Sequence, residues 1–448
     1  MKECTTSAAQ VSRRRFLRWI AIGSAGSLLA ACGQSASTSP SAPAQTGPVT
    51  LRLRTFLDPR GPSPREQAFA SIIERFQKDH QDIQVNIETA PFDQLNTKLI
   101  VENESGNVPD VTYLQPQYIT QVVQANSLLA LDPFISSMGQ SWRDEFSSQG
   151  LWDQTVIDGK KYTMALGAHT RVLYTRPDLF EKAGLSGSTP PQTLDELVEF
   201  GQKLTSGNTY GLGYTMAPAG STIELTFNAL FWGFGGEHLD AAGKAAFNSE
   251  AGVKTLDFMR SLVREWKITP EDVLSVPYAE LAQQFPEGRF GMMLDGNFRL
   301  SGWLEKGMNE QTLAAFPFPS ASGKPAPIFT NSWDVGIPAA VPEARQEAAW
   351  KLVNYFFKPE INLEYVKAEG SLSPLKSLAN DPAFNTPWHK TLGDVLNNYS
   401  RTLPKTAYLN EMHDALVKAL QSVLLDQQSS QAALDEAAKT YNTAAGVA

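Results

Sequence analysis

The sequence is poor in cysteine, with only Cys4 and Cys32 among its 448 residues. We expect Cys4 to be removed with an export signal and Cys32 to be modified, which leaves the mature chain without a disulfide. An exported chain without disulfides depends on large hydrophobic cores. The roughly 400 mature residues suffice for two or more domains, because a single core stops growing near 250–300 residues.

Beyond residue 31 the chain also lacks basic runs, and the formal net charge of the whole sequence is −9. Cleavage before Cys32 would remove five basic residues and one acidic residue, so the mature side-chain charge becomes −13. An acidic chain without a basic patch argues against nucleic acid and polyanionic substrates. It says little about a neutral ligand.

Motifs of common enzymes are absent as well. The chain has no Gly-x-Ser-x-Gly, no His-Glu-x-x-His, no phosphate-binding Gly-x-x-x-x-Gly-Lys-Ser/Thr and no EF-hand loop. Its five histidines, at positions 80, 169, 238, 389 and 413, are too scattered for a recognisable metal cluster. We therefore expect a protein that is not an enzyme and that binds neither a cofactor nor a metal.

The apolar stretch near the N-terminus, Trp19 to Ala31, is too short to span a membrane. It follows the twin-arginine segment 12–17 and ends at Leu29-Ala30-Ala31-Cys32. A basic region, a short apolar region and small residues indicate a secretory signal of twin-arginine type over residues 1–31. The last four residues resemble a lipobox, which would make Cys32 the lipidated first residue of the mature protein. Residues 32–48, rich in Ser, Ala, Thr, Gln and Pro, are then expected to form a disordered tether.

From Val49 onward the sequence predicts alternating strands and helices. Val49, Leu51 and Leu53 alternate with polar residues, and so do Ile83, Val85 and Ile87. Between them, a helix is predicted by Phe69, Ile72, Ile73 and Phe76, which fall on one helical face. A second helix and a strand over 109–114 follow. Strand–helix–strand–helix–strand order implies a parallel sheet with right-handed crossovers.

Later segments continue the alternation. Thr193 and Glu196 have the spacing of a capping box, which predicts a helix start. Phe290–Leu294 is predicted as a buried strand, and helices are expected over 343–357, 409–425 and 431–441. No second segment resembles 33–48. The two α/β bodies should therefore be joined by strands rather than by a flexible linker.

Six segments in order resemble the extracellular solute-binding proteins of ABC importers, in the carbohydrate-binding, maltose-binding-protein-like branch. They are 49–58; 107–111, with Pro109-Asp110-Val111; 158–180; 190–197, where Leu194 stands for the usual tryptophan; 285–293, where Phe290-Gly291 replace two small residues; and 348–352, Ala-Ala-Trp-Lys-Leu. The resemblance covers essentially residues 49–448.

The resemblance implies a two-lobed α/β fold of the periplasmic-binding-protein type, each lobe a mostly parallel sheet flanked by helices, with a ligand cleft at the hinge. Lobe one would comprise 49–168 and 331–372, and lobe two 172–330 and 373–448, with three crossings between them. It also implies capture of a mono- or oligosaccharide, hinge closure and delivery to permease subunits. We expect a monomer, exported and lipid-anchored to the outer face of the cytoplasmic membrane.

A pocket for sugars needs aromatic platforms and planar polar partners, and loops at the carboxyl ends of strands supply both. In lobe one the candidates are Phe56, Asp58, Arg60, Tyr113, Gln115 and Tyr118. At the hinge and in lobe two they are Arg171, Trp232, Asp295, Asn297, Phe298, Trp333 and Asp334. Each has a structural alternative: Asp58 and Arg60 could form a solvated ion pair in a turn, and Tyr113 and Trp232 could belong to the core.

Two other functions remain open at this point. The same fold could bind a polyol, a sugar phosphate or a nucleoside, although a phosphate would require more than Arg60 and Arg171 in the cleft. A secreted glycosidase would need two close carboxylates, for which Asp58, Asp295 and Asp334 are the candidates.

Overall fold

The computed structural model describes residues 48–146 and 149–447. The predicted signal of 1–31, the lipidation at Cys32 and the tether apart from Pro48 lie outside these residues. Gly47–Ala448 clusters as one compact unit. Within it, two separate hydrophobic cores define a first and a second lobe. In the described residues no helix is long and apolar enough to cross a membrane.

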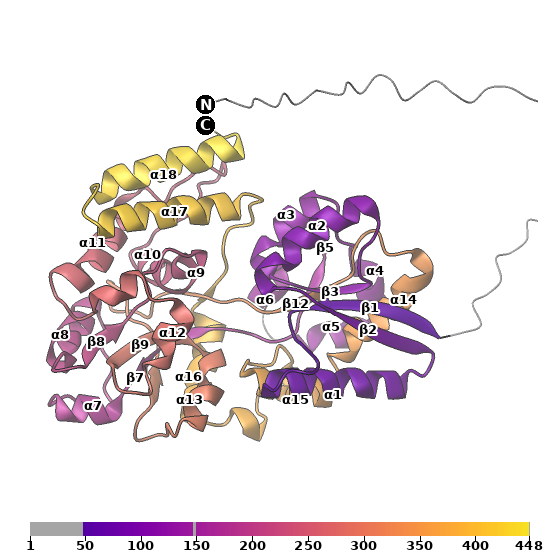
Figure 1. Ribbon diagram of the computed structural model, residues 1–448, viewed down its shortest axis with the longest axis horizontal. Helices are drawn as coiled ribbons and strands as arrows, with labels where there is room; N and C mark the ends of the chain where they lie inside the picture. Colours follow the sequence, from indigo (N-terminus) through magenta and orange to yellow (C-terminus); the bar gives the residue numbers. More distant parts are fainter. Residues whose placement is uncertain (1–47, 147–148, 448) are drawn as a thin grey trace, which may run out of the picture. The chain divides into compact units, whose positions relative to one another are not determined.

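The first lobe is built on a five-stranded sheet of order β2-β1-β3-β12-β6 (Figure 1). Its strands are β1 (Val49–Thr55), β2 (Ile83–Thr89), β3 (Val111–Leu114), β6 (Thr163–Ala165) and β12 (Asp334–Gly336). β1 pairs in parallel with β2 and β3, as the alternation of 49–114 predicts. β12 pairs antiparallel with β3 and β6.

Helices from two separate stretches of the chain, 64–154 and 343–369, pack around this sheet. They are α1 (Pro64–Asp79), α2 (Leu95–Ser105), α3 (Ile119–Gln124), α4 (Asp132–Met138), α5 (Gln140–Asp144), α6 (Gln149–Gln154), α14 (Glu343–Tyr355) and α15 (Pro359–Glu369). A small hairpin, β4 (Val156–Ile157) and β5 (Lys160–Lys161), completes the lobe. In α1 the buried side chains are the four that the helical periodicity predicts, and a capping box of Ser63 and Glu66 begins the helix.

The second lobe is built on a four-stranded sheet of order β10-β7-β9-β8. Its strands are β7 (Arg171–Thr175), β8 (Tyr210–Gly213), β9 (Phe290–Gly296) and β10 (Ala314–Phe316), and β11 (Ile328–Phe329) pairs with β13 (Ser400–Arg401) beside it. β9 is buried along its whole length, as its apolar run predicts. Thr193 caps helix α8 (Leu194–Leu204), because its side-chain oxygen accepts a hydrogen bond from the backbone N–H of Glu196.

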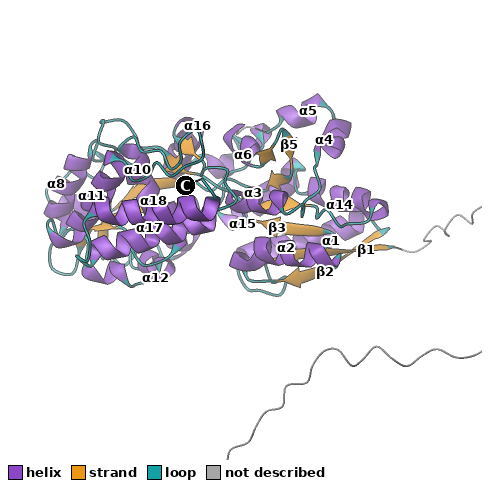
Figure 2. Ribbon diagram, turned by 90° about the horizontal axis from the view of Figure 1, so that it is seen from above, coloured by secondary structure: helices purple, strands orange, loops and turns teal. Residues whose placement is uncertain are grey.

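The helices of the second lobe include the end of the chain. They are α7 (Pro177–Lys182), α8 (Leu194–Leu204), α9 (Gly220–Thr222), α10 (Asn228–Gly233), α11 (Glu250–Arg264), α12 (Tyr278–Gln283), α13 (Leu300–Glu305), α16 (Pro387–Asn398), α17 (Leu409–Leu424) and α18 (Ser430–Ala445). The last two lie side by side and pack on α11 (Figures 1 and 2).

The two-lobed α/β prediction is confirmed, but the sheets are mixed rather than mostly parallel. In each sheet, strands that enter from the other lobe, β12 in the first and β7 in the second, pair antiparallel with their neighbours. These strands run back across the hinge, so their direction is opposite to that of the strand–helix–strand units. Leu375 and Leu378 also belong to the first core, although the sequence places 373–448 in lobe two.

Strands join the lobes, as expected from the absence of a second flexible segment. The chain crosses between β6 and β7, between β11 and β12, and again after α15. The crossings pair with one another: His169 bridges to Asn331, and Ala168 bridges to Leu372. Asn297 ties them further, because its Oδ1 accepts from the Thr170 N–H at 3.0 Å and its Nδ2 donates to the Gly370 carbonyl at 2.8 Å.

Candidate functional site

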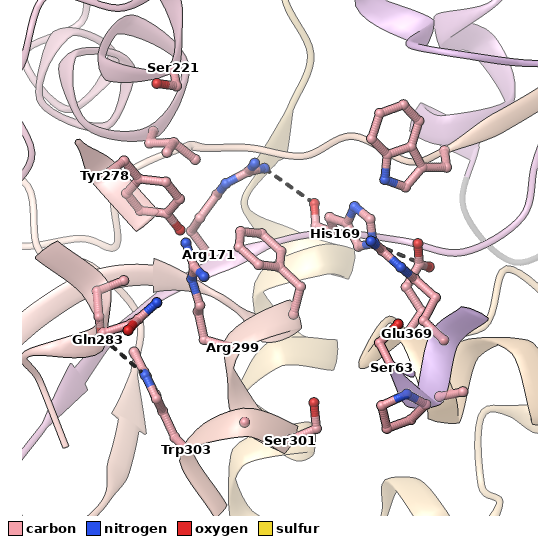
Figure 3. Close-up of a pocket in the computed structure, with 18 of the residues that line it drawn as sticks. Ser63, His169, Arg171, Ser221, Tyr278, Gln283, Arg299, Ser301, Trp303 and Glu369 are labelled. Carbon is pink, nitrogen blue, oxygen red and sulfur yellow. Dashed lines mark hydrogen bonds and ion pairs between the residues drawn. The ribbon is translucent and has the colours of Figure 1, made fainter. Parts of the chain in front are cut away.

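A cavity of about 780 Å³ is lined by residues of both lobes and of the crossings (Figure 3). Its lining includes the start of α1 and the end of α15 from the first lobe, and α12, α13 and the turn before α13 from the second. Figure 3 shows Tyr278, Arg171 and Arg299 on one side of this cavity and His169, Glu369 and Ser63 on the other. Because its walls come from two separately packed bodies, movement of one lobe against the other would change its width.

Aromatic rings line the cavity from both lobes. Trp333 and Phe92 come from the first lobe and lie edge to face, with ring centroids 6.4 Å apart. Phe92 is 54% exposed, which is unusual for a large apolar side chain. Phe298 and Tyr278 come from the second lobe. Flat apolar faces with polar edges are the surfaces on which a sugar ring can lie.

The first crossing places the imidazole of His169 beside these rings. The His169 ring lies 5.6 Å from that of Phe298, and its Nε2 is 3.3 Å from a Glu369 carboxylate oxygen. Burial raises the pKa of Glu369, but His169, Arg65 and the Ser371 hydroxyl together lower it by more. The net shift is therefore downward, and the carboxylate stays charged.

Arg171 extends from β7 into the same cavity and is only 4% exposed. Its Nη1 donates to the Phe329 carbonyl at 2.8 Å and to Asn331 Oδ1 at 3.0 Å. These bonds hold the guanidinium against the second crossing. Asn331 itself lines the cavity, so a planar amide and a planar cation stand next to each other there.

A buried carboxylate lies behind the second-lobe wall. Asp295 accepts from the Tyr278 hydroxyl and from the Gly296 N–H at 2.6 Å, and lies 3.6 Å from Arg299 Nε. Burial raises the pKa of Asp295, against the opposing effects of Arg299 and Tyr278. Asp295 therefore orients two lining side chains rather than lining the cavity itself.

Glu224 links the lobes at another edge of the cavity. It lies in a short π-helical turn, Ile223–Phe227, a kind of turn that often occurs at functional sites. Its Oε1 accepts from Tyr118 of the first lobe at 3.3 Å and from Gln117 at 3.4 Å. Burial raises the pKa of Glu224. The nearby Arg171 lowers this pKa, but by less than burial raises it, so the net shift is upward.

A smaller neighbouring cavity of about 230 Å³ shares Phe92, Ser221 and Glu224 with the main one. Gln115 and Tyr118, which the sequence predicts as ligand contacts, line this smaller cavity. The two cavities together form one extended polar and aromatic region.

Of the residues predicted from the sequence, Arg171, Phe298 and Trp333 line the main cavity. Phe56 lies behind Trp333, with ring centroids 4.2 Å apart. Asn297 is 1% exposed and fastens the crossings.

The other predicted residues have structural positions outside the cavity linings. Asp58 and Arg60 are an exposed ion pair in a turn, 3.3 Å apart. Tyr113 is fully buried between Phe56 and Phe69. Trp232 is 3% exposed and packs in the second core, under the Arg401 guanidinium.

Asp334 is fully buried in the first sheet, where it accepts from Thr163 Oγ1 at 2.6 Å and from Ser332. The three carboxylates considered for a glycosidase therefore lie in different surroundings: Asp58 at an exposed turn, Asp295 behind the second-lobe wall and Asp334 within the first sheet. Among the described residues they form no pair facing the cavity.

Several lining residues were missed by the sequence analysis. Arg299 and Phe92 follow strands, so the rule that placed Phe298 could have found them. Arg65, Tyr278 and Glu224 come from helices, and no local signal marks them. Within 48–146 and 149–447, no group of three or more His, Cys, Asp or Glu residues is placed to hold a metal ion.

Comparison with known proteins adds to this geometry. The model of a family described as bacterial extracellular solute-binding protein matches residues 61–362. The galactooligosaccharide-binding protein of Bacillus subtilis (strain 168) is 22% identical over 425 residues, which cover 92% of this chain and 93% of that protein.

Solved structures share the fold at low identity. Maltose-bound MalE3 of T. maritima superposes with a TM-score of 0.76 and 23% identity, covering 88% of this chain and 100% of that one. A solute-binding protein of Agrobacterium radiobacter K84, in complex with ribitol, superposes with a TM-score of 0.75 and 22% identity. The match covers 89% of this chain and 99% of that one.

Proposed function

The chain belongs to the bacterial extracellular solute-binding proteins, and we propose that it captures a sugar in the cavity between its lobes and delivers it to an ABC importer. The observation that carries the proposal is the composition of that cavity. Trp333 and Phe92 of one lobe and Phe298 and Tyr278 of the other line it, together with planar polar groups. Members of this family bind substrates rather than convert them.

Each group in the cavity has a role in sugar binding. The rings of Trp333 and Phe298 would stack on the C–H faces of a sugar ring. Asn331, Glu369 and Gln283, with the guanidinium groups, would donate to and accept from its hydroxyls. A volume of about 780 Å³ is within the usual range for small-molecule pockets.

The names of similar proteins support a saccharide. One relative is named for galactooligosaccharides, another, at 21% identity over 208 residues, for arabinooligosaccharides, and one similar structure holds maltose. The ribitol-bound structure favours a second candidate, a polyol, which would use the same hydroxyl partners but less of the aromatic surface.

Delivery would depend on the three paired crossings. Ligand contacts to both lobes favour a closed arrangement over an open one, and this difference in free energy shifts the population toward the form that a permease recognises. We further propose that the chain is exported by its twin-arginine signal, acts as a monomer and is anchored through a lipid on Cys32.

Thermal unfolding of the full-length protein against sugars, polyols and amino acids tests the proposal. A ligand at 100 times its Kd stabilises the folded state by about 2.7 kcal/mol, which for a chain of about 400 residues corresponds to a rise in Tm of roughly 3 °C. A rise confined to related saccharides would support sugar capture. A response only to polyols would favour the second candidate, and a response only to amino acids would contradict both.

A further inference from the structure

Arg171 is a buried cation whose hydrogen bonds all go to neutral groups. They are the Phe329 carbonyl, the Asn331 side-chain oxygen and the His169 carbonyl, at 2.8, 3.0 and 3.4 Å. Among residues 48–146 and 149–447, no carboxylate oxygen lies within 4.0 Å of its guanidinium. Its Nε is buried without a hydrogen-bond partner in that part of the chain. Arg171 thus lines the cavity without a counter-ion.

The other ionisable groups of the wall have partners of their own. Arg299 faces Asp295 at 3.6 Å, and His169 faces Glu369 at 3.3 Å. Glu224 attracts Arg171 from beyond 4.0 Å, but its Oε1 is engaged by Gln117 and Tyr118. Glu224 therefore makes no direct ion pair with Arg171.

Holding an unpaired guanidinium at 4% exposure is unfavourable. Burial lowers the pKa of Arg171, and Tyr278, Glu224 and Asp295 oppose this only in part. An arginine side chain nevertheless remains protonated in proteins. A negative charge brought by a ligand would supply the missing partner, with a bidentate geometry that fits a carboxylate.

We propose that the solute is an acidic sugar, a saccharide with one carboxylate, and that this carboxylate pairs with Arg171. The inference rests on the proposed function and narrows it. Arg171 and Arg299 both lie over the Phe298 ring, at 5.9 and 5.5 Å from its centroid. A sugar stacked on Phe298 would therefore have its carboxylate within reach of both guanidinium groups.

One unpaired guanidinium favours a single charge over the dianion of a sugar phosphate. Phosphate sites gather several donors around three oxygens, whereas Arg299 is already paired here and Glu224 and Glu369 line the same cavity. A second full negative charge would meet these carboxylates rather than a cation.

Isothermal titration of the full-length protein with matched pairs tests the proposal. The pairs are D-galacturonate with D-galactose and D-glucuronate with D-glucose. Because a hydrogen bond to a charged group contributes more than a neutral one, we expect the acidic member of at least one pair to bind at least about 10-fold more tightly. D-glucose 6-phosphate is expected to bind more weakly than D-glucuronate.

Variants assign the preference to the named side chains. Arg171→Lys keeps the charge but loses the bidentate fork, and Arg299→Met removes the second guanidinium without touching the hinge bonds of Arg171. Both should lower uronate affinity by more than they lower affinity for the neutral partner. Arg60→Ala removes an exposed arginine outside the cavity and should change neither the uronate affinity nor the affinity for the neutral sugar.

The outcomes distinguish a failure of the acidic-sugar inference from a failure of sugar capture itself. Neutral sugars that bind as tightly as their acidic partners would overturn the acidic-sugar inference and leave sugar capture standing. Tighter binding of the sugar phosphate would overturn it as well. If no saccharide binds, neutral or acidic, the proposed function fails together with the inference.

Discussion

The rings of Trp333 and Phe56 lie 4.2 Å apart at an interplanar angle of 39°, with Trp333 toward the cavity and Phe56 behind it. Phe56 in turn lies edge-on to buried Tyr113. The cavity-facing ring is therefore supported by a continuous aromatic stack that reaches the first core. Such support fixes the platform before a ligand arrives, which lowers the ordering cost of binding.

Removing this platform should weaken sugar binding. Trp333→Ala is expected to lower affinity about 30-fold, since a central aromatic contact typically contributes about 2 kcal/mol. Trp333→Phe should recover most of the loss. Isothermal titration with the sugar found in the thermal panel gives both numbers. Trp232→Phe, in the second core, is the matched control, and an equal loss there would contradict the assignment of Trp333.

The exposed turn of Asp58 and Arg60 should not contribute to binding. Both side chains lie outside the two cavities and pair with each other in solvent. Asp58→Ala and Arg60→Ala should leave affinity within about twofold and should not measurably change the urea midpoint of unfolding. A tenfold loss of affinity in either variant would show that the turn reaches the ligand.

Asn297 should matter for stability more than its size suggests. Its side chain bonds to Thr170, Ala168 and Gly370, so Asn297→Ala leaves buried backbone groups without partners. We expect a loss of at least about 2 kcal/mol in the free energy of unfolding by urea. Exposed Asn398, which bonds only within α16, provides the control. Similar losses for Asn398→Ala and Asn297→Ala would contradict the role of Asn297.

Buried histidines should make the protein less stable in mild acid. Burial lowers the pKa of His413 to about 4, from an ordinary value near 6.5. Between these values the unfolded chain binds a proton that the folded chain does not, so stability falls as pH falls. For His413 alone the loss between pH 7 and pH 5 is about 2 kcal/mol.

His413→Phe tests this pH dependence, because it keeps a ring against Tyr118 and removes the titrating group. Urea unfolding of both proteins at pH 7 and pH 5 should show a smaller acid-induced loss in the variant, by about 2 kcal/mol. His238, whose pKa is lowered to about 3 by burial and, to a smaller extent, by His413 and Arg401, contributes a loss of the same sign in both proteins. An unchanged acid-induced loss would contradict the prediction.

The fold was largely predictable because apolar periodicity reports burial directly. The alternation in Val49–Leu53 and the one-sided face of Phe69–Phe76 correspond to β1 and α1. The antiparallel pairing of β7 and β12 was not predictable in this way, because periodicity does not give the direction from which a strand enters a sheet.

The site was predictable only in part, for a related reason. The end of a strand locates a residue at the sheet edge but does not say toward which face its side chain points. Phe298 points into the cavity, whereas Asp295 and Asn297, from the same segment, turn inward to hold Tyr278 and the crossings. Tyr278 and Glu224 reach the cavity from helices that fold back on it, a long-range relation that local sequence does not carry.

The crystal structure of the full-length protein grown with the saccharide that gives the largest rise in Tm tests the central claim most directly. If the protein captures a sugar between its lobes, one saccharide will lie in the cavity, with its ring against Phe298 or Trp333 and its polar groups near Arg171 and Asn331. A saccharide bound elsewhere, for example in the groove between α17 and α18, with an empty cavity between the lobes, would contradict it.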